Sequence, residues 1–231
     1  MYSGEPGKPQ LWEHTMAHIH LEDGSFTLFW VIVWWVVALL LIAAALVRVR
    51  SVKKTDSRKI TLAAFCTAAA FAIFQVSLPI FGGVHLNLTP LIGILTGPAL
   101  GSLIVLIINM LSTAIGHGGW GLIGANLLIN VTEVVVTYGL WRGLKKPVPG
   151  AFARAGIATF AGLFCGNLVL IGIILVSGVQ GVTQTTPQIL TGLTLVAGIN
   201  MVVAVIEAFI TGMIIVYILR LRPDMLEVER P

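Results

Sequence analysis

The chain has 231 residues, of which 57% are hydrophobic and only 10% are charged, and its formal net charge is +4. So few charged residues cannot cover the surface of a soluble domain of this length, which excludes an ordinary soluble protein and predicts an integral membrane protein. The positive charges lie in the gaps between long apolar runs. They therefore indicate membrane orientation and contact with anionic lipid of the bilayer, and they make no case for nucleic-acid binding.

Residues 1–25 are polar and predict an extracytoplasmic leader. A helix needs about 20 apolar residues to cross a hydrocarbon core of ~30 Å. Runs that meet or nearly meet this length follow in chain order at Phe26–Val47, Ile60–Phe81, Leu122–Trp141, Ala153–Ser177 and Gly192–Leu219. We expect residues 26–222 to form one all-α, polytopic membrane bundle and residues 223–231 to form a cytoplasmic tail.

The run Leu86–Ile115 is too long for one ordinary span, and Gly97-Pro98 interrupts it. Proline removes a backbone donor and disfavours helix in the residue before it, so a break is expected there. Basic residues follow the first run (Arg48, Arg50, Lys53, Lys54, Arg58, Lys59), the Leu122–Trp141 run (Arg142, Lys145, Lys146, Arg154) and the last run (Arg220, Arg222). All three groups are cytoplasmic only if Leu86–Ile115 crosses twice. The sequence therefore predicts about seven transmembrane helices, with the N-terminus outside and the C-terminus in the cytoplasm.

This topology places all five histidines at one face of the membrane. His14, His18 and His20 precede the first helix, His85 follows the second and His117 follows the fourth. A single loop histidine is usually only a polar surface residue, but five at the outer face favour a transition-metal site, because imidazole is a common ligand for such ions. The segment after Gly82-Gly83 is also short, since Leu86–Thr96 would rise only ~16 Å as a helix. We expect this backbone to enter the bundle around a cavity, with His85 at that cavity.

Polar residues share faces of two later helices. Helical spacing brings together Asn126, Asn130, Glu133 and Thr137 on one helix, and Asn200, Glu207 and Thr211 on the last, while Asn109 lies on the fourth. We interpret the asparagines as interhelical hydrogen-bonding residues. A carboxylate within a membrane is a candidate functional group, so Glu133 and Glu207 are either structural or gating residues. Both are expected to lie too deep for a site at the outer mouth.

Four short motifs occur in a characteristic order. They are His20–Gly24, the segment Leu78–Leu86 that contains Gly82-Gly83 and His85, Gly97-Pro98, and the stretch from Gly116–Gly119 to Gly124–Asn126. Together with the tail from Glu207 to Asp224, they resemble the CbiM/NikM family over about residues 18–225. The members of that family are the membrane substrate-binding (S) components of energy-coupling factor (ECF) transporters for cobalt and nickel.

The resemblance implies a flat metal site made of nitrogen atoms. In the family these come from the free amino terminus, the amide and side chain of a histidine at position two, and a loop histidine, which His85 matches here. Aligned on Asp23-Gly24, His20 is the counterpart of the first histidine, but it is not residue two. If translation starts at Met16 and the methionine is removed, the Ala17 amine and His18 recreate the chelate instead.

The sequence does not decide whether translation starts at Met1 or at Met16. If Met1 is the true start, we expect His18 and His20 both to supply side chains. His14 is not expected to take part. His117 stands where the family has Asp, and we place it, with Asn126, beside the ligands rather than among them. The ligand chemistry suits Co(II) and Ni(II) equally, so the sequence leaves the choice of transported metal open.

The energy for transport is expected to come from partner proteins. No GxxxxGK[ST] sequence occurs in the chain, so it is not expected to bind ATP by that route. The resemblance implies a transmembrane coupling (T) protein, two ABC ATPase subunits and often a small accessory membrane subunit. Ala64, Ala68 and Ala72 form a ridge of small residues on the second helix, which either packs inside the bundle or docks on the coupling protein.

These observations predict a multi-pass plasma-membrane subunit of a cobalt or nickel importer that supplies cobalamin or nickel-enzyme biosynthesis. The alternatives are a nickel-specific importer subunit and a stand-alone permease for divalent transition metals. A membrane metalloenzyme is disfavoured, because the chain contains neither HExxH nor a nucleophile and base near the site. We therefore expect no enzymatic activity.

Overall fold

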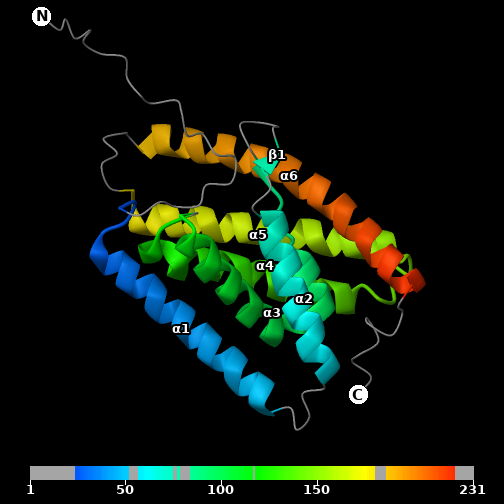
Figure 1. Ribbon diagram of the computed structural model, residues 1–231. Helices are drawn as coiled ribbons and strands as arrows, with labels where there is room; N and C mark the ends of the chain where they lie inside the picture. The colour runs from blue at the N-terminus through cyan, green and yellow to red at the C-terminus, as the bar shows by residue number, and fades with distance from the viewer. Residues whose placement is uncertain are drawn as a thin grey trace, which may run out of the picture.

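The computed structural model describes residues 24–51, 57–74, 77–78, 84–116, 118–179 and 186–221. Its long elements are six helices (Figure 1): α1 Leu28–Ser51, α2 Ser57–Phe74, α3 Thr89–Ala114, α4 Ile123–Gly143, α5 Ala151–Ser177 and α6 Thr186–Leu221. A single 3-10 turn, Trp120–Leu122, precedes α4. This helical bundle confirms the predicted all-α architecture.

Five of these helices are long and apolar enough to cross a membrane, and α2 is the shorter exception. The first helix illustrates their lipid-facing character, because only Ala38, Ile42 and Ala45 of its residues are buried. Its remaining surface carries large exposed apolar side chains such as Leu28 and Phe29, which are stable in contact with lipid but not with water. The described residues thus form six helices where the sequence predicts about seven.

The difference in helix count lies in α3, which contains both halves of the run Leu86–Ile115. Within it Gly97 has a non-helical backbone with φ 78° and ψ 173°, and Pro98 follows. The predicted break at Gly97-Pro98 is therefore confirmed. A positive φ is easily adopted only by glycine, which explains why glycine occupies this position. The number of membrane crossings and the orientation of the termini stay predictions.

A small hairpin, which the sequence did not predict, connects α2 to α3. Strand β1, Ser77–Leu78, pairs antiparallel with strand β2, Val84–His85, so that Ser77 lies opposite His85. The prediction of one helix over Ile60–Phe81 is wrong at its C-terminal end, because α2 ends at Phe74. Pro79 in the sequence supplies a reason, since a proline cannot continue the helical hydrogen-bond ladder.

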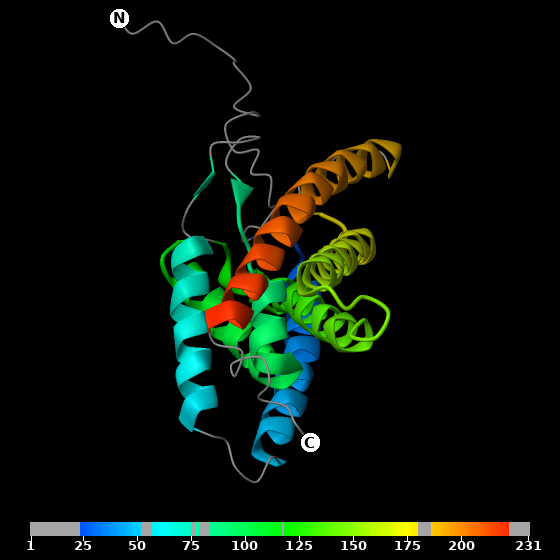
Figure 2. The same cartoon turned by 90° about the vertical axis from the view of Figure 1, so that its right-hand side faces the viewer.

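Helix α4 is the centre of the bundle and packs against α1, α3 and α5. Close approach to α1 depends on Gly124, where an added Cβ would lie 2.6 Å from the backbone of Trp34. On the far side, α5 packs against α6, which runs obliquely above α5 in the second view (Figure 2). Helix α2 packs on α3. Buried apolar residues form one cluster between α1, α2, α3 and α4 and another between α3, α4, α5 and α6. Helix α4 contributes to both clusters, so polar residues of several helices can meet around it.

Basic residues lie in the last turns of three helices. Arg48 and Arg50 end α1, Arg142 lies in the last turn of α4, and Arg220 lies in the last turn of α6. In Figure 1 the C-terminal ends of α1 and α6 lie at the opposite end of the bundle from the C-terminal end of α5. Near the start of α5, the Arg154 guanidinium stacks 3.7 Å from the centre of the Trp141 ring. Such pairs are typical where a helix meets the polar boundary of a membrane.

Candidate functional site

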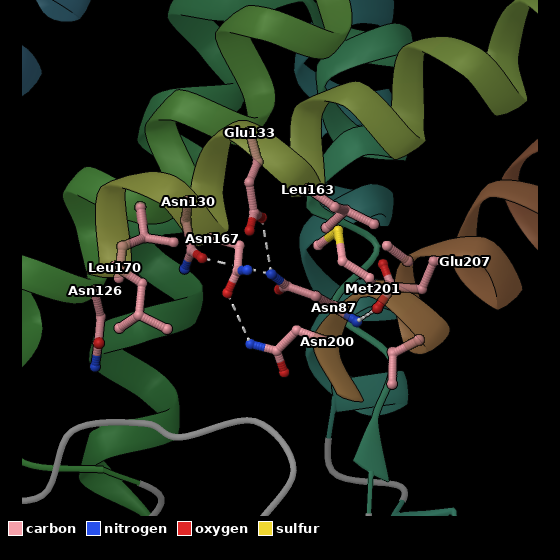
Figure 3. Close-up of a pocket in the computed structure, with 13 residues that line it drawn as sticks. Asn87, Asn126, Asn130, Glu133, Leu163, Asn167, Leu170, Asn200, Met201 and Glu207 are labelled. Carbon is pink, nitrogen blue, oxygen red and sulfur yellow. Dashed lines mark hydrogen bonds between the residues drawn. The ribbon is translucent and has the colours of Figure 1, made fainter. Parts of the chain in front are cut away.

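A polar cavity of about 70 Å³ lies between the segment that precedes α3 and the helices α4, α5 and α6 (Figure 3). Its apolar lining includes Ile129, Leu163 and Met201. The polar lining consists of five asparagines and two glutamates: Asn87, Asn126, Asn130, Glu133, Asn167, Asn200 and Glu207. A cavity of this size has room for more than one water molecule.

Asn87 lies where the two carboxyl groups converge. Its backbone N–H donates to Glu207 Oε1 at 2.8 Å, and its side-chain Nδ2 donates to Glu133 Oε2 at 2.9 Å. The same Nδ2 lies 3.5 Å from Asn130 Oδ1, which is a weaker contact. Asn87 thereby links the segment before α3 to α4 through its side chain and to α6 through its backbone (Figure 3).

Two acceptor atoms around the cavity remain unsatisfied. Asn200 Nδ2 donates to Asn167 Oδ1 at 3.1 Å and joins α6 to α5, but Asn200 Oδ1 has no hydrogen-bond partner among the described residues. Glu207 Oε2 also has no partner among them, although the side chain is fully buried. Buried acceptors without donors are costly, so a molecule that occupies this cavity is favoured if it donates hydrogen bonds.

Glycine positions one of the carboxyl groups. Glu133 is 5% exposed and packs over Gly166 of α5, where an added Cβ would lie 2.6 Å from both Glu133 Cγ and Oε1. Any side chain at position 166 would therefore displace the glutamate from its present site. The close approach of α4 and α5 at this glycine is what allows Glu133 to reach Asn87.

The shared faces that the sequence predicts are confirmed on both helices. Asn126, Asn130 and Glu133 line the cavity from α4, and Asn200 and Glu207 line it from α6. The residues that end the two faces, Thr137 and Thr211, are fully buried but do not line the cavity. The interhelical interpretation holds for Asn200 but is wrong for Asn109, because its Nδ2 donates to Val105 O of its own helix at 2.7 Å.

Glu133 and Glu207 lie close to the segment that carries His85, and their depth relative to the outer mouth stays a prediction. Both bind Asn87, which follows His85 by two positions. Sequence reasoning also missed Asn87 itself and Asn167. The available signal for Asn167 was a strongly polar side chain inside the otherwise apolar run of α5, which is costly in a membrane unless it is paired.

The histidines of the predicted metal site fall largely outside the described residues. His14, Ala17, His18, His20 and His117 are outside them, and His85 is described only by its backbone in β2. Among the described side chains, no group of three or more His, Cys, Asp or Glu is arranged to hold a metal ion. The ligand set therefore stays a prediction. Asn126, predicted to lie beside the ligands, is 8% exposed and lines the cavity.

The small-residue ridge of α2 faces outward. Ala64, Ala68 and Ala72 are exposed, whereas the buried residues of the described part of this helix are Ala63, Cys66 and Ala70. Of the two interpretations of the ridge, packing inside the bundle does not apply. Its partner stays a prediction.

Comparison with protein families identifies the chain. A family model for CbiM, described as the cobalt uptake substrate-specific transmembrane region, matches residues 20–225. The chain belongs to the CbiM family. This confirms the resemblance on which the sequence analysis relied, and with five helices able to span a bilayer it makes this CbiM family member a multi-pass membrane protein.

Several cobalt transport proteins named CbiM are similar to this chain. The protein from Salmonella typhimurium is 29% identical over 164 residues, which cover 66% of this chain and 65% of the relative. The protein from Carboxydothermus hydrogenoformans is 32% identical over 158 residues, covering 65% of this chain and 62% of the relative, and that from Ruminiclostridium cellulolyticum is 27% identical over 155 residues, covering 65% and 61%. The chain thus spans less than two thirds of the length of these relatives. Their names describe transport and not catalysis, in line with a non-enzymatic protein.

Two solved structures have a similar fold. A crystal structure of a transition metal transporter matches with a TM-score of 0.71 at 21% identity, over 87% of this chain and 93% of the other. A truncated transition metal transporter matches with a TM-score of 0.72 at 22% identity, over 87% of this chain and 99% of the other. These likenesses show that the arrangement of helices is shared.

Proposed function

We propose that this CbiM family member is the metal-binding S component of an ECF-type importer, and that its cargo is Co²⁺ or Ni²⁺ for cobalamin or nickel-enzyme biosynthesis. The family match over residues 20–225 and the cobalt transport relatives support the proposal. The structural observation that carries it is the position of His85 in β2, two residues before Asn87, which lines a buried polar cavity. The backbone of a residue whose side chain is a common transition-metal ligand therefore lies two positions along the chain from the cavity lining.

In this proposal His85 is one ligand and the leader supplies the others. His18 and His20 provide imidazoles, and the Ala17 amine takes part if the mature chain begins there. Nitrogen donors in a flat arrangement suit Ni(II), Cu(II) and Co(II) and exclude Mg²⁺ and Ca²⁺, which prefer oxygen. We place His117 and Asn126 beside the ligands, where hydrogen bonds orient coordinating side chains.

We also propose that the leader, residues 1–25, lies outside the membrane, that residues 26–222 form the transmembrane domain, and that residues 223–231 are cytoplasmic. The basic last turns of α1, α4 and α6 support this orientation. The non-helical Gly97 inside α3 supports two crossings by its two halves, which gives seven in total. Cysteine accessibility labelling of Ser51→Cys and Gly150→Cys from the cytoplasmic side tests the arrangement, and labelling of either one from outside contradicts it.

Import requires energy from partners, for which we propose a transmembrane T protein, two ABC ATPases and a small accessory membrane subunit. The exposed ridge Ala64, Ala68 and Ala72 is the proposed contact with the T protein. Ala68→Trp should abolish ATP-dependent metal uptake in cells that contain the partners, while purified protein still binds metal. Leu40→Trp, on the exposed surface of α1, is the matched control and should transport normally. Normal uptake by Ala68→Trp contradicts this docking surface.

Calorimetric titration of Co²⁺ and Ni²⁺ into the wild type and a His85→Ala variant tests the central function. The wild type should bind one ion, and the variant should bind both metals far more weakly, because one of the imidazole ligands is lost. The ratio of the two wild-type affinities distinguishes a cobalt importer from a nickel-specific one. If His85→Ala binds as tightly as the wild type, the proposed site is wrong.

A further inference from the structure

The segment between β2 and α3 is held by side chains from two other helices. Only Leu86, Asn87 and Leu88 separate His85 from the first residue of α3. The middle one, Asn87, donates through its backbone to Glu207 Oε1 at 2.8 Å and through its side chain to Glu133 Oε2 at 2.9 Å. Hydrogen bonds to carboxylates are among the stronger ones in proteins, so this segment is fixed at its centre.

The backbone next to Asn87 is strained. Leu88 has a φ of 49°, which is the left-handed region that residues with a Cβ rarely adopt, and it is 4% exposed. It precedes α3 without a side-chain capping hydrogen bond. A conformation of this kind persists only where its surroundings determine it. The described surroundings of this kind are the two bonds of the neighbouring Asn87 to buried carboxyls and the burial of Leu88 itself.

Because Asn87 follows His85 by only two positions, the hydrogen bonds that fix Asn87 also restrict the position of His85 along the backbone. Two residues span at most about 7 Å even when fully extended. A shift of Asn87 therefore moves the end of β2, which carries His85. The two glutamates thus act on the metal-binding strand, although they come from α4 and α6.

A purely structural role explains the two glutamates less well. Interhelical hydrogen bonds in membrane proteins are commonly made by neutral Asn, Gln, Ser and Thr, as Asn200 and Asn167 do here. Glu207 is fully buried, with Oε2 unpaired among the described residues, and burial of such a group opposes stability. Two carboxyls that converge on one residue beside a proposed ligand are expected where the position of that ligand matters more than the stability of the bundle.

We propose that Glu207 and Glu133 are positioning residues for metal binding, which hold Asn87 and thereby set the position of strand β2 and His85. The inference rests on the proposed function of His85 as a ligand. It assigns the buried carboxyls a role in the geometry and affinity of the metal site and not in direct coordination.

Three variants of α6 test the proposal. Glu207→Ala removes the acceptor for the Asn87 N–H, and we expect Co²⁺ affinity to fall ~10- to 100-fold, as is usual when a group that orients a metal ligand is lost. The visible absorption bands of the Co²⁺ complex should also shift at saturation. Glu207→Gln keeps an oxygen acceptor and should restore most of the affinity and the wild-type bands. Thr211→Val is the matched control: Thr211 is fully buried one turn further along α6, and its hydroxyl has no partner among the described residues.

The melting temperature in detergent distinguishes positioning from folding. A positioning role predicts weak binding by a Glu207→Ala protein that melts close to the wild type. Wild-type affinity and bands in Glu207→Ala contradict the proposal. If that variant does not fold, Asn87→Ala serves instead, because it loses the bond to Glu133 and keeps its backbone N–H. Wild-type binding by Asn87→Ala would overturn the positioning role of Glu133, whose bond this variant removes.

The His85→Ala variant separates this inference from the proposed function. If His85→Ala retains full affinity, the proposed metal site itself is wrong. If His85→Ala loses binding while Glu207→Ala and Asn87→Ala do not, His85 remains a ligand and only the positioning role is wrong.

Discussion

Polar side chains in two regions of this bundle satisfy their hydrogen-bonding groups in different ways. Along α3, buried or partly buried side chains donate to their own helix: Thr96 to Ile92 O at 2.8 Å, Ser102 to Pro98 O at 2.7 Å and Asn109 to Val105 O at 2.7 Å. Around the cavity, Asn87 and Asn200 instead donate to side chains of other elements.

Hydrogen bonds within one helix and hydrogen bonds between elements have different consequences for the fold. A side chain that donates to the carbonyl four residues before it needs no particular neighbour, so its loss affects little beyond one turn. A side chain that joins two helices depends on their relative position and in turn fixes it. The cavity residues, and not the equally polar residues of α3, are therefore the ones expected to control the metal site. Four experiments test this contrast, from the largest expected effect to the smallest.

Gly166→Ala should have the largest effect, because the new Cβ would lie 2.6 Å from Glu133 Cγ and force the carboxyl away from Asn87. We expect the free energy of unfolding in mixed micelles to fall by ~1–3 kcal/mol, as for other overpacked cores, with a parallel loss of Co²⁺ affinity. Gly172→Ala is the matched control on the same helix, where nothing lies within 4 Å of an added Cβ. Equal stability of the two variants would contradict the account of how Glu133 is placed.

A double-mutant cycle measures the bond between Asn87 and Glu133 directly. Using Asn87→Ala and Glu133→Ala, we expect a coupling energy of ~0.6–1.7 kcal/mol, the range seen for side-chain hydrogen bonds between membrane helices. A second cycle that combines Asn87→Ala with Asn109→Ala should give a coupling near zero, because the described hydrogen bond of Asn109 goes to Val105 O of its own helix. Equal coupling energies in the two cycles would contradict the proposed difference between the cavity residues and the polar residues of α3.

Asn167→Ala should have a smaller effect on unfolding, of about 0.6 kcal/mol, because it removes the single bond at 3.1 Å that joins α5 to α6 at Asn200. The same mixed-micelle unfolding experiment measures it. Asn167 lines the cavity, and its described hydrogen bond is with Asn200 and not with Asn87, so metal affinity should change less than in Glu207→Ala. A larger loss of affinity in Asn167→Ala than in Glu207→Ala would show that the wrong residues have been assigned the positioning role.

Asn109→Leu should be the mildest change, within about 0.5 kcal/mol of the wild-type unfolding free energy, because its hydrogen bond is local and an apolar side chain suits the interior of a membrane helix. Metal affinity should be unchanged. Calorimetric titration of Co²⁺ checks this, and a marked loss of affinity would mean that the α3 polar residues also belong to the site.

Much of the fold follows from the sequence, because its signals are local. Length and hydropathy located the helical runs, and glycine followed by proline located the break in α3 at Gly97. Spacing of three and four residues identified the polar faces of Glu133 on α4 and Glu207 on α6. Each of these predictions depends only on residues within a few turns of one another.

The features that the sequence did not predict depend on contacts between segments that are distant in the chain, or on elements too short to give a pattern. Strands of two residues, such as Val84–His85, are too short to give an alternating pattern. No local pattern singles out Asn87, because its importance comes from Glu133 and Glu207, which lie far away in the chain. The approach of the segment before α3 to these glutamates was missed for the same reason, because no local pattern encodes it.

The central claim is that one metal ion is held jointly by the leader and by strand β2. X-ray absorption at the cobalt edge tests it most directly, because scattering from imidazole rings counts the histidines around a bound ion. Wild type, His85→Ala and His18→Ala/His20→Ala proteins would be compared at saturating Co²⁺. The account predicts a nitrogen-rich shell in the wild type from which each variant loses imidazole scattering. An unchanged spectrum in His85→Ala, or a shell made of oxygen alone in the wild type, would contradict it.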